Sequence, residues 1–350
     1  FANPFEVGFF DTEGRTLDVA LSGTYAYLAD GDAGLRIIDR SNPSNPGEVG
    51  FWDTAGIAFG VAVKDTLAYV TDGIEGLRII DISDPTTPNE VGFFDTGGVA
   101  LDVIVRDNYA YVADATAGLR IIDVSDLVNI NEVGFFFTGG SAEAVSLEDN
   151  YAFVASGSAG LRIIDISDPT MPFEIGFKGT SSVTRDIAIN QNYAYVVDGD
   201  DGLRVFDISS PASPESVGFY NTDGRALGVA FSSDFIYVAD DGGGVFILRN
   251  DFLTGVEDTR SIPSAFSLSQ NYPNPFNPTT KIRYSLVQNS NVILKVFNIL
   301  GQEIQTLVNK TQVAGEYEIS WNSGDLPSGL YVYRLQAGQS VEIRKMILLR

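Results

Sequence analysis

The sequence predicts an all-β protein: a six-bladed β-propeller followed by a small antiparallel, immunoglobulin-like β-sandwich. Three observations lead to this prediction. A unit of 42 residues recurs six times without insertion or deletion, and each unit contains four short runs rich in Val, Ile, Phe and Tyr. After residue 250 the repeat gives way to a Pro-rich segment and a new series of such runs. Four short strands in a unit of about 40–45 residues are typical of one propeller blade.

Two sequence markers define the repeat. Gly-Leu-Arg-Ile-Ile-Asp begins at Gly34 and returns, with variants, every 42 residues up to Gly244. Val-Gly-Phe-Phe begins at Val7 and recurs, with variants, at the same step. Gly, Asn, Asp and Pro, which favour turns, separate the runs. In the first unit we expect strands over Val7–Asp11, Leu17–Leu21, Tyr25–Ala29 and Leu35–Asp39.

The phase of the repeat predicts how the ring closes. The sequence opens on a Val-Gly-Phe-Phe strand, and no further copy of that strand follows Gly244–Leu248. We expect Val7–Asp11 to pair with Gly244–Leu248 as the outer strand of the last blade, because closure removes two free sheet edges. There is no initiator Met and no basic-then-apolar start, so we expect either a removed signal peptide or a fragment.

Composition excludes several kinds of chemistry. The chain has 22 basic and 46 acidic residues, a net charge of −24, and neither Cys nor His. Disulfides, thiolate metal sites and His-dependent triads are therefore excluded, and a metal would have to be a hard cation such as calcium on oxygen ligands. The acidic charge argues against nucleic acid as a partner. No apolar run reaches the roughly 18 residues of a membrane span.

The segment after the repeat predicts a second domain. We expect the propeller over residues 1–250, a linker over 251–263 and the sandwich over 264–350, because prolines cluster at the junction and short strand-like runs follow. The expected strands are Lys281–Leu286, Val292–Ile299, Glu303–Val308, Gly315–Trp321, Gly329–Leu335 and Val341–Leu349. Residues 263–350 hold eight basic and five acidic residues, whereas the rest of the chain holds 14 and 41. The negative charge is thus a property of the propeller.

The repeat resembles a known family. Tyr-Val-Ala-Asp at Tyr111–Asp114, the Gly-Leu-Arg-Ile-Ile-Asp string and Ile-Ser-Asp-Pro at Ile82–Pro85 are similar to the LVIVD repeats of bacterial and archaeal surface proteins. The resemblance covers about residues 1–250. It implies a β-propeller but no particular activity.

The second domain resembles a sorting domain. The strings Asn271–Thr280 and Phe297–Glu303, together with the C-terminal Gly329–Tyr331 and Arg344–Met346, are similar to the type A C-terminal sorting domain of the bacterial type IX secretion system. The resemblance implies a source in the Bacteroidota, recognition by the secretion machinery, and passage through the periplasm to the outer-membrane surface or the medium. It assigns the sorting motif to Tyr272, Pro273, Asn274, Pro275, Phe276, Asn277, Pro278, Arg344 and Lys345.

Three Asp residues form the first candidate site. The innermost strands of the blades begin, in order, with Asp18, Gly60, Asp102, Ala144, Asp186 and Gly228, so Asp alternates with a small residue. These carboxylates could converge on the channel and hold calcium. Alternatively, each accepts hydrogen bonds from backbone N–H groups of a neighbouring loop. A further Asp–Arg pair recurs in the hairpins of nearly every blade, for which we expect a scaffold role.

The second candidate site is a break in the repeat symmetry. Glu13 and Arg15 stand where the middle units carry small residues, and Asp223 and Arg225 occupy the same positions in the last unit. Ring closure would make these units neighbours. We therefore expect one polar ligand-binding patch, or alternatively the drift that is common in terminal repeats. Its members are Glu13, Arg15, Asp223, Arg225, Asp240 and Asp241.

These features favour a non-enzymatic, monomeric protein at the cell surface or in the medium. Its expected task is adhesion or the binding of an extracellular protein or polysaccharide. Carboxylate-dependent hydrolysis or lyase cleavage of glycans is the alternative, because Asp and Glu are abundant; a structural role in a surface layer is the second. Catalysis is less favoured because the sequence has no His and no Gly-x-Ser-x-Gly motif.

Overall fold

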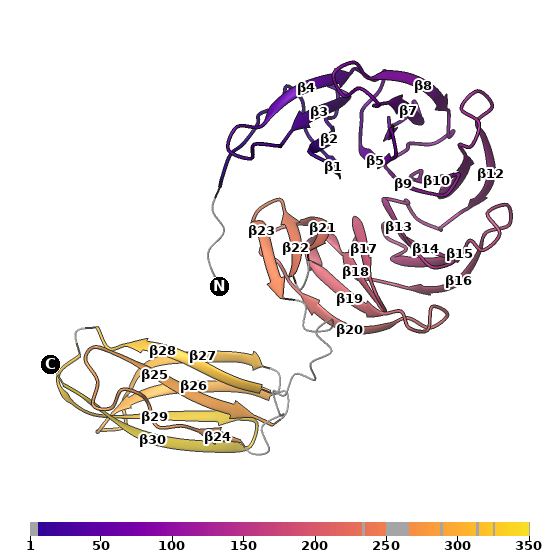
Figure 1. Ribbon diagram of the computed structural model, residues 1–350. Helices are drawn as coiled ribbons and strands as arrows, with labels where there is room; N and C mark the ends of the chain where they lie inside the picture. The colour runs from indigo at the N-terminus through magenta and orange to yellow at the C-terminus, as the bar shows by residue number, and fades with distance from the viewer. Residues whose placement is uncertain are drawn as a thin grey trace. The chain divides into compact units, whose positions relative to one another are not determined.

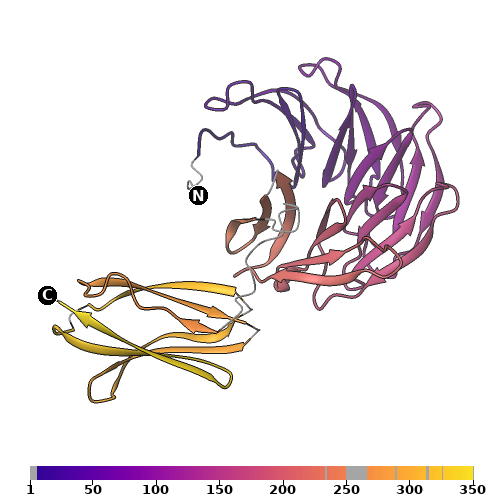
Figure 2. The same ribbon diagram turned by 60° about the horizontal axis from the view of Figure 1, so that its bottom comes forward.

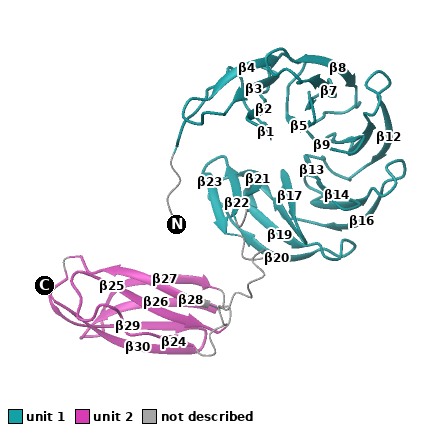
Figure 3. Ribbon diagram, viewed as in Figure 1, with its two compact units in different colours: residues 1–253 teal, residues 254–350 magenta. Residues whose placement is uncertain are grey.

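The structure is a computed structural model that describes residues 6–232, 235–249, 266–287, 290–312, 315–324 and 326–349. It consists of two compact units, residues 1–253 and 254–350 (Figure 3). The expected linker 251–263 lies outside the described residues. Apart from one short 3₁₀ helix, η1 (Gly199–Asp201), the regular elements of the described residues are β-strands.

The first unit is a ring of six antiparallel sheets, which confirms the six predicted blades (Figures 1 and 2). In each sheet the strands pair in chain order, from the innermost to the outermost. The first three blades are β1 (Asp18–Ser22), β2 (Tyr25–Ala29), β3 (Leu35–Asp39), β4 (Gly47–Trp52); β5 (Gly60–Lys64), β6 (Leu67–Thr71), β7 (Leu77–Asp81), β8 (Asn89–Phe94); and β9 (Asp102–Arg106), β10 (Tyr109–Ala113), β11 (Leu119–Asp123), β12 (Asn131–Phe136).

The second half of the ring repeats this plan, except that its last blade has three strands. The remaining blades are β13 (Ala144–Glu148), β14 (Tyr151–Ala155), β15 (Leu161–Asp165), β16 (Phe173–Lys178); β17 (Asp186–Asn190), β18 (Tyr193–Val197), β19 (Leu203–Asp207), β20 (Glu215–Tyr220); and β21 (Ala226–Ser232), β22 (Phe235–Asp240), β23 (Gly244–Arg249).

Each blade packs on the next through one face of its middle strands. In blade 1, Tyr27, Leu35 and Ile37 are buried in one cluster with Val70 and Ile80 of blade 2. Successive residues of a strand point to opposite faces, so a fully apolar run such as Leu-Arg-Ile-Ile serves two neighbours at once. The hydrophobic core is therefore a series of layers between blades.

The Gly of the Val-Gly-Phe-Phe marker is explained by a close contact between backbones. A Cβ at Gly50 would lie 2.1 Å from the carbonyl oxygen of Pro85 in the next blade. Gly134 stands in the same relation to Pro169, also at 2.1 Å. The outer strand of one blade thus rests directly on the Pro-containing turn of the next, and no side chain fits between them.

The predicted closure by the N-terminal segment is wrong. Val7–Asp11 forms no strand, and β23 is the free edge of the three-stranded sixth sheet. The segment instead keeps its contact with blade 1, where a Cβ at Gly8 would lie 2.3 Å from the carbonyl oxygen of Pro43. This is the contact that Gly50 makes with Pro85. The segment therefore satisfies the local Gly–Pro contact without pairing with β23.

The open ring leaves apolar side chains exposed on the two blades that flank the gap. In blade 6, Val245 is 64% exposed and Ile247 44% exposed, whereas the equivalent Leu119 and Ile121 of blade 3 are completely buried. In blade 1, Val19 is 52% exposed, although its counterparts in blades 2 to 5 are 5–6% exposed. Both flanking faces are therefore faces that the other blades bury.

Paired substitutions test whether this gap is open in solution. We expect Val245→Asn to change the free energy of unfolding by less than about 1 kcal/mol, because the side chain is already in water. Leu119→Asn should cost on the order of 4 kcal/mol, because it buries an amide without partners and leaves a cavity. Thermal and denaturant unfolding of the full-length variants measure both. A loss for Val245→Asn as large as that for Leu119→Asn would show that the face is covered.

The second unit is the predicted sandwich of two antiparallel sheets. One sheet has the order β24-β25-β28 and the other β27-β26-β29-β30. The core between them includes Phe276, Tyr284, Trp321 and Tyr333. All six predicted strands are present. The strands are β24 (Ser267–Leu268), β25 (Thr279–Leu286), β26 (Ser290–Asn298), β27 (Glu303–Gln312), β28 (Gly315–Asn322), β29 (Gly329–Ala337) and β30 (Ser340–Leu348).

Candidate functional site

The hairpin Asp residues hold the loops at one end of the blades. Asp30 is completely buried, and its carboxylate accepts hydrogen bonds from the Oγ1 atoms of Thr12 and Thr16 at 2.8 and 2.7 Å and from the N–H of Gly14 at 3.0 Å. It therefore fixes the loop that leads into β1. In blade 3, burial raises the pKa of Asp114 to about 6, although hydrogen bonding by Thr96 lowers it.

The expected Asp–Arg pairs are present in three blades. They join Asp72 to Arg78 at 3.5 Å, Asp114 to Arg120 at 3.4 Å, and Asp198 to Arg204 at 3.6 Å. In each pair the Asp side chain is completely buried and the Arg side chain is largely buried. Buried, mutually satisfied charges that recur from blade to blade are consistent with a scaffold role.

Asp18, Asp102 and Asp186 each tie two blades together. One carboxylate oxygen accepts the N–H of the following residue, and the other accepts an N–H from the innermost strand of the next blade. The inter-blade bonds are Asp18 with Val61 (2.8 Å), Asp102 with Val145 (2.8 Å) and Asp186 with Val229 (2.7 Å). These ties join blades 1 and 2, 3 and 4, and 5 and 6. The alternation of Asp with a small residue therefore divides the ring into three pairs of blades.

This arrangement gives no support to a calcium site. Both oxygens of each carboxylate already accept backbone N–H groups. Across the described residues, no group of three or more carboxylates is placed so that it could hold a metal ion. Burial raises the pKa of Asp102 to about 7 and that of Asp186 to about 6, and the Asp18 carboxylate raises both further. The alternative interpretation, acceptance of backbone N–H groups, describes the geometry.

The six residues of the predicted polar patch lie in two separate places. Glu13 and Arg15 are exposed and line a pocket of about 720 Å³ between blades 1 and 2, which we call the blade 1–2 pocket. In blade 6, Asp240 is buried and accepts the N–H groups of the two following glycines, and the N–H of Asp241 donates to the carbonyl oxygen of Arg225 at 2.9 Å. Within the described ranges, no hydrogen bond or ion pair joins the two groups, because the ring does not bring blades 1 and 6 together.

The blade 1–2 pocket combines charges of both signs with an apolar lining. The loop before β1, the β2–β3 hairpin and the loop before β5 form it, and it takes in Arg36 of β3. Sequence analysis identified Glu13 and Arg15 but missed the partners from the neighbouring blade. The side chains that line the pocket include Glu13, Arg15, Leu17, Asp32, Arg36, Asp53, Ile57 and Phe59. Such a lining suits a ligand that has an apolar face and polar or charged groups at its edge.

In the second unit, the two ends of the predicted sorting motif lie side by side. The N–H of Phe276 donates to the carbonyl oxygen of Ile347 at 2.9 Å, and the N–H of Leu349 donates to the carbonyl oxygen of Phe276 at 3.0 Å. The Asn274 side chain accepts the N–H of Ile347 at 2.9 Å. The segment 271–278 is therefore attached to β30, which carries Arg344 and Lys345. Phe276 is buried, whereas Tyr272 is 80% exposed.

Tyr333 supports the start of this segment from β29. Its hydroxyl accepts the N–H of Asn271 at 2.8 Å and donates to the carbonyl oxygen of Ser269 at 2.7 Å. Burial raises the pKa of Tyr333 to about 12. In addition, the Asn271 amide donates to the hydroxyl oxygen of Thr280 at 2.9 Å. The motif thus encodes a fixed backbone path as well as exposed side chains.

Fold and motif together define a repeat propeller joined to a sorting sandwich, and family comparison specifies both. The chain belongs to the LVIVD-repeat family, whose model matches residues 13–54, 55–96, 97–138, 139–179, 182–222 and 223–251. A second model, the secretion system C-terminal sorting domain, matches residues 270–349. The sorting domain marks proteins that the type IX secretion system delivers to the cell surface or the medium. A comparison with curated proteins found no match.

Solved structures share the fold at low sequence identity. The computationally designed Ika8 protein is 12% identical with a TM-score of 0.55, covering 96% of this chain and 97% of its own. PorZ, an essential surface component of the type IX secretion system of Porphyromonas gingivalis, is 13% identical with a TM-score of 0.53; the match covers 96% of this chain and 52% of PorZ. The β-propeller domain of Myceliophteria thermophila Cps50 (Swd1) is 10% identical with a TM-score of 0.56, covering 69% and 85%.

The structure also bears on membrane insertion. Within the part of the chain that the structure describes, no helix has the length and apolarity that crossing a bilayer requires.

Proposed function

We propose that this protein is an adhesion or ligand-binding protein of the cell surface, in which the sorting domain delivers the propeller and the propeller binds an extracellular partner. The observation that carries the proposal is the blade 1–2 pocket. It lies where the repeat departs from its own symmetry, since blade 1 has Glu13 and Arg15 where blade 2 has Ala55 and Ile57. A site for one ligand needs such a departure, because identical blades would offer identical surfaces.

Removal of the two exposed charges tests the pocket. Full-length protein is first screened on arrays of defined oligosaccharides and peptides, and each hit is then titrated by calorimetry. We expect Glu13→Ala/Arg15→Ala to weaken binding at least tenfold, because one hydrogen bond to a charged group contributes about 1.5–3 kcal/mol and about 1.4 kcal/mol is a factor of ten.

Blade 6 supplies a matched control. Asp223 and Arg225 occupy the same repeat positions as Glu13 and Arg15, but they do not line the pocket. Asp223→Ala/Arg225→Ala should therefore leave the affinity unchanged. Equal affinities of the wild type and both double variants for every hit would contradict the assignment of the pocket.

The same material separates binding from cleavage. Carboxylates of the propeller could act on a bound glycan as general acid and base. Release of new reducing ends by the wild type, and its loss in Glu13→Gln, would favour the glycan-cleaving alternative. Binding without release of reducing ends favours adhesion.

A further inference from the structure

The outer strands of the propeller carry an exposed Phe at one repeated position. A Phe side chain is ordinarily buried, so five exposed rings at intervals of 42 residues form a patterned surface. They lie on the outermost strands of five successive blades, which follow the circumference of the ring in Figure 1. Their exposed fractions are 50% for Phe51, 60% for Phe93, 48% for Phe135, 59% for Phe177 and 68% for Phe219.

Each ring is held in place by a largely buried Arg. The Arg36 guanidinium carbon lies 4.6 Å from the centre of the Phe51 ring, and a nitrogen of the same group lies 3.6 Å from Glu48. In blade 3 the Arg120 guanidinium carbon lies 5.3 Å from the centre of the Phe135 ring. Cation–π contact and ion pairing fix the ring before any ligand arrives, which lowers the entropic cost of binding.

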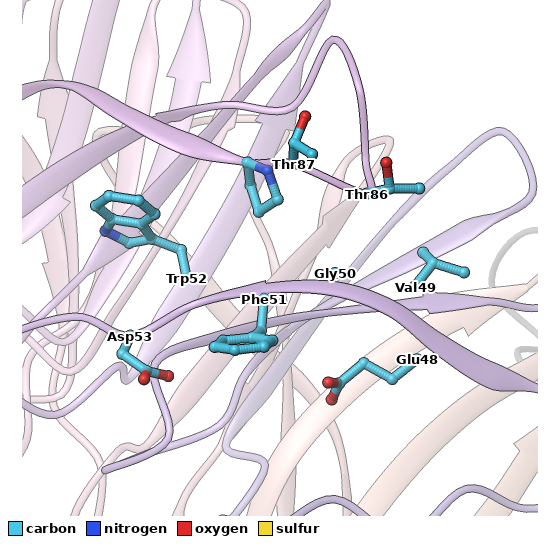
Figure 4. A pocket seen from close by; sticks show the side chains of 9 residues that line it. Glu48, Val49, Gly50, Phe51, Trp52, Asp53, Thr86 and Thr87 are labelled. Atoms are coloured by element: carbon cyan, nitrogen blue, oxygen red, sulfur yellow. The ribbon is translucent and has the colours of Figure 1, made fainter.

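Two of these rings line grooves that are built from the same parts. The first, of about 550 Å³, lies between β4, which carries Phe51, and the turn Thr86–Pro88 of the next blade (Figure 4). The second, of about 660 Å³, lies between β12, which carries Phe135, and the turn Thr170–Pro172. Every one of these positions recurs after 84 residues. We call both sites outer grooves.

We propose that the outer grooves bind an uncharged polysaccharide, with a sugar ring stacked on each exposed Phe. An aromatic ring offers an apolar face to the C–H groups of a sugar, while the nearby Glu and Thr side chains can hydrogen-bond its hydroxyls. A repeated site matches a ligand that itself repeats, and simultaneous contacts raise the affinity for a polymer. The excess of 41 acidic over 14 basic residues outside 263–350 disfavours anionic polymers. This proposal rests on the binding role proposed above but uses a different surface.

The test compares polymers with their short fragments. Full-length protein is titrated with a soluble β-1,4-glucan, an α-1,4-glucan, a mannan and the trisaccharide of each, with a polyuronate as the anionic arm. For at least one neutral polymer we expect an affinity at least tenfold above that of its trisaccharide. That affinity should fall stepwise, severalfold for each ring removed, in F51A, then F51A/F135A, then F51A/F93A/F135A/F177A.

Three controls make the result decisive. Tyr at positions 51 and 135 keeps the aromatic face and should retain most of the affinity, which separates loss of stacking from loss of fold. Ile74→Ala removes a side chain that is 71% exposed on a hairpin away from the grooves and should have no effect. Glu13→Ala/Arg15→Ala should leave polymer binding intact even where it abolishes binding in the blade 1–2 pocket.

Three outcomes would overturn the proposal. These are affinity for peptides but for none of the polysaccharides, preference for the polyuronate, and polymer binding that the Phe variants leave unchanged. The last of these, combined with loss of binding in Glu13→Ala/Arg15→Ala, would refute the outer grooves while it leaves the proposed function standing. Loss of binding in the Phe variants alone would do the reverse to the blade 1–2 pocket.

Discussion

Replacement of Phe276 by Ala is expected to unfold the sorting domain at growth temperature and to prevent secretion. The side chain is 2% exposed, and its ring centre lies 5.6 Å from that of Trp321 in the core of the sandwich. Truncation of a buried Phe costs about 3–5 kcal/mol, and a small domain has about 5–15 kcal/mol in all. The loss also weakens the backbone bonds that attach residue 276 to Ile347 and Leu349.

Calorimetry and cell fractionation measure the two consequences. We expect the melting transition of the sandwich to fall by more than about 10 °C, since 1 kcal/mol corresponds to about 4–8 °C in a domain of this size. The propeller transition should stay in place. In the host, Phe276→Ala should leave the protein in the periplasm, as deletion of residues 264–350 should.

Tyr272 of the same motif is the matched control. Its side chain is 80% exposed, so Tyr272→Ala should leave the melting transition unchanged. Defective secretion of Tyr272→Ala would then mark a residue that the machinery contacts. Normal secretion of Phe276→Ala with a folded propeller and a destabilised sandwich would contradict the link between this fold and export.

The fold was predictable because the repeat encodes it locally. A constant step of 42 residues fixes the number of blades, and the turn residues between apolar runs fix the number of strands per blade. Ring closure is different in kind. It depends on whether six inter-blade angles add up to a full turn, and no residue of Val7–Asp11 carries that information. The Gly8–Pro43 contact is local, and it is the part of the prediction that the structure retains.

The candidate sites were predictable to different degrees. The period placed Asp18, Asp102 and Asp186 at equivalent positions, but it could not show that each side chain turns toward the next blade and uses both oxygens there. Loss of symmetry pointed correctly to Glu13 and Arg15. Their pocket partners in blade 2 were not predictable, because they come from a neighbouring repeat. The exposed Phe series was visible in the Val-Gly-Phe-Phe marker, yet only burial distinguishes its exposed ring from a core residue.

The propeller should be more stable at pH 5 than at pH 8, an unusual direction for an acidic group to impose. An Asp in an unfolded chain has a pKa of about 3.9, whereas burial raises the pKa of Asp102 to about 7 and that of Asp186 to about 6. The folded state therefore binds protons that the unfolded state releases between about pH 4 and pH 7. This contribution to stability is complete below the unfolded pKa and is lost as the pH rises through the folded values.

The composition makes this prediction measurable. The chain has no His, the side chain that ordinarily titrates between pH 5 and pH 8, so the raised carboxyl groups Asp102, Asp114 and Asp186 should dominate the change. One unit of pKa shift corresponds to about 1.4 kcal/mol, which predicts a difference on the order of several kcal/mol and a melting temperature of the propeller higher by several degrees at pH 5. Asp102→Asn cannot ionise and should remove the largest single share of this difference, whereas Asp39→Asn, at an exposed turn whose hydrogen bond from Ser41 lowers the pKa, should not alter it. An equal pH dependence in the wild type and Asp102→Asn would show that the carboxyl groups of the inter-blade ties stay ionised throughout, because their backbone N–H bonds outweigh burial.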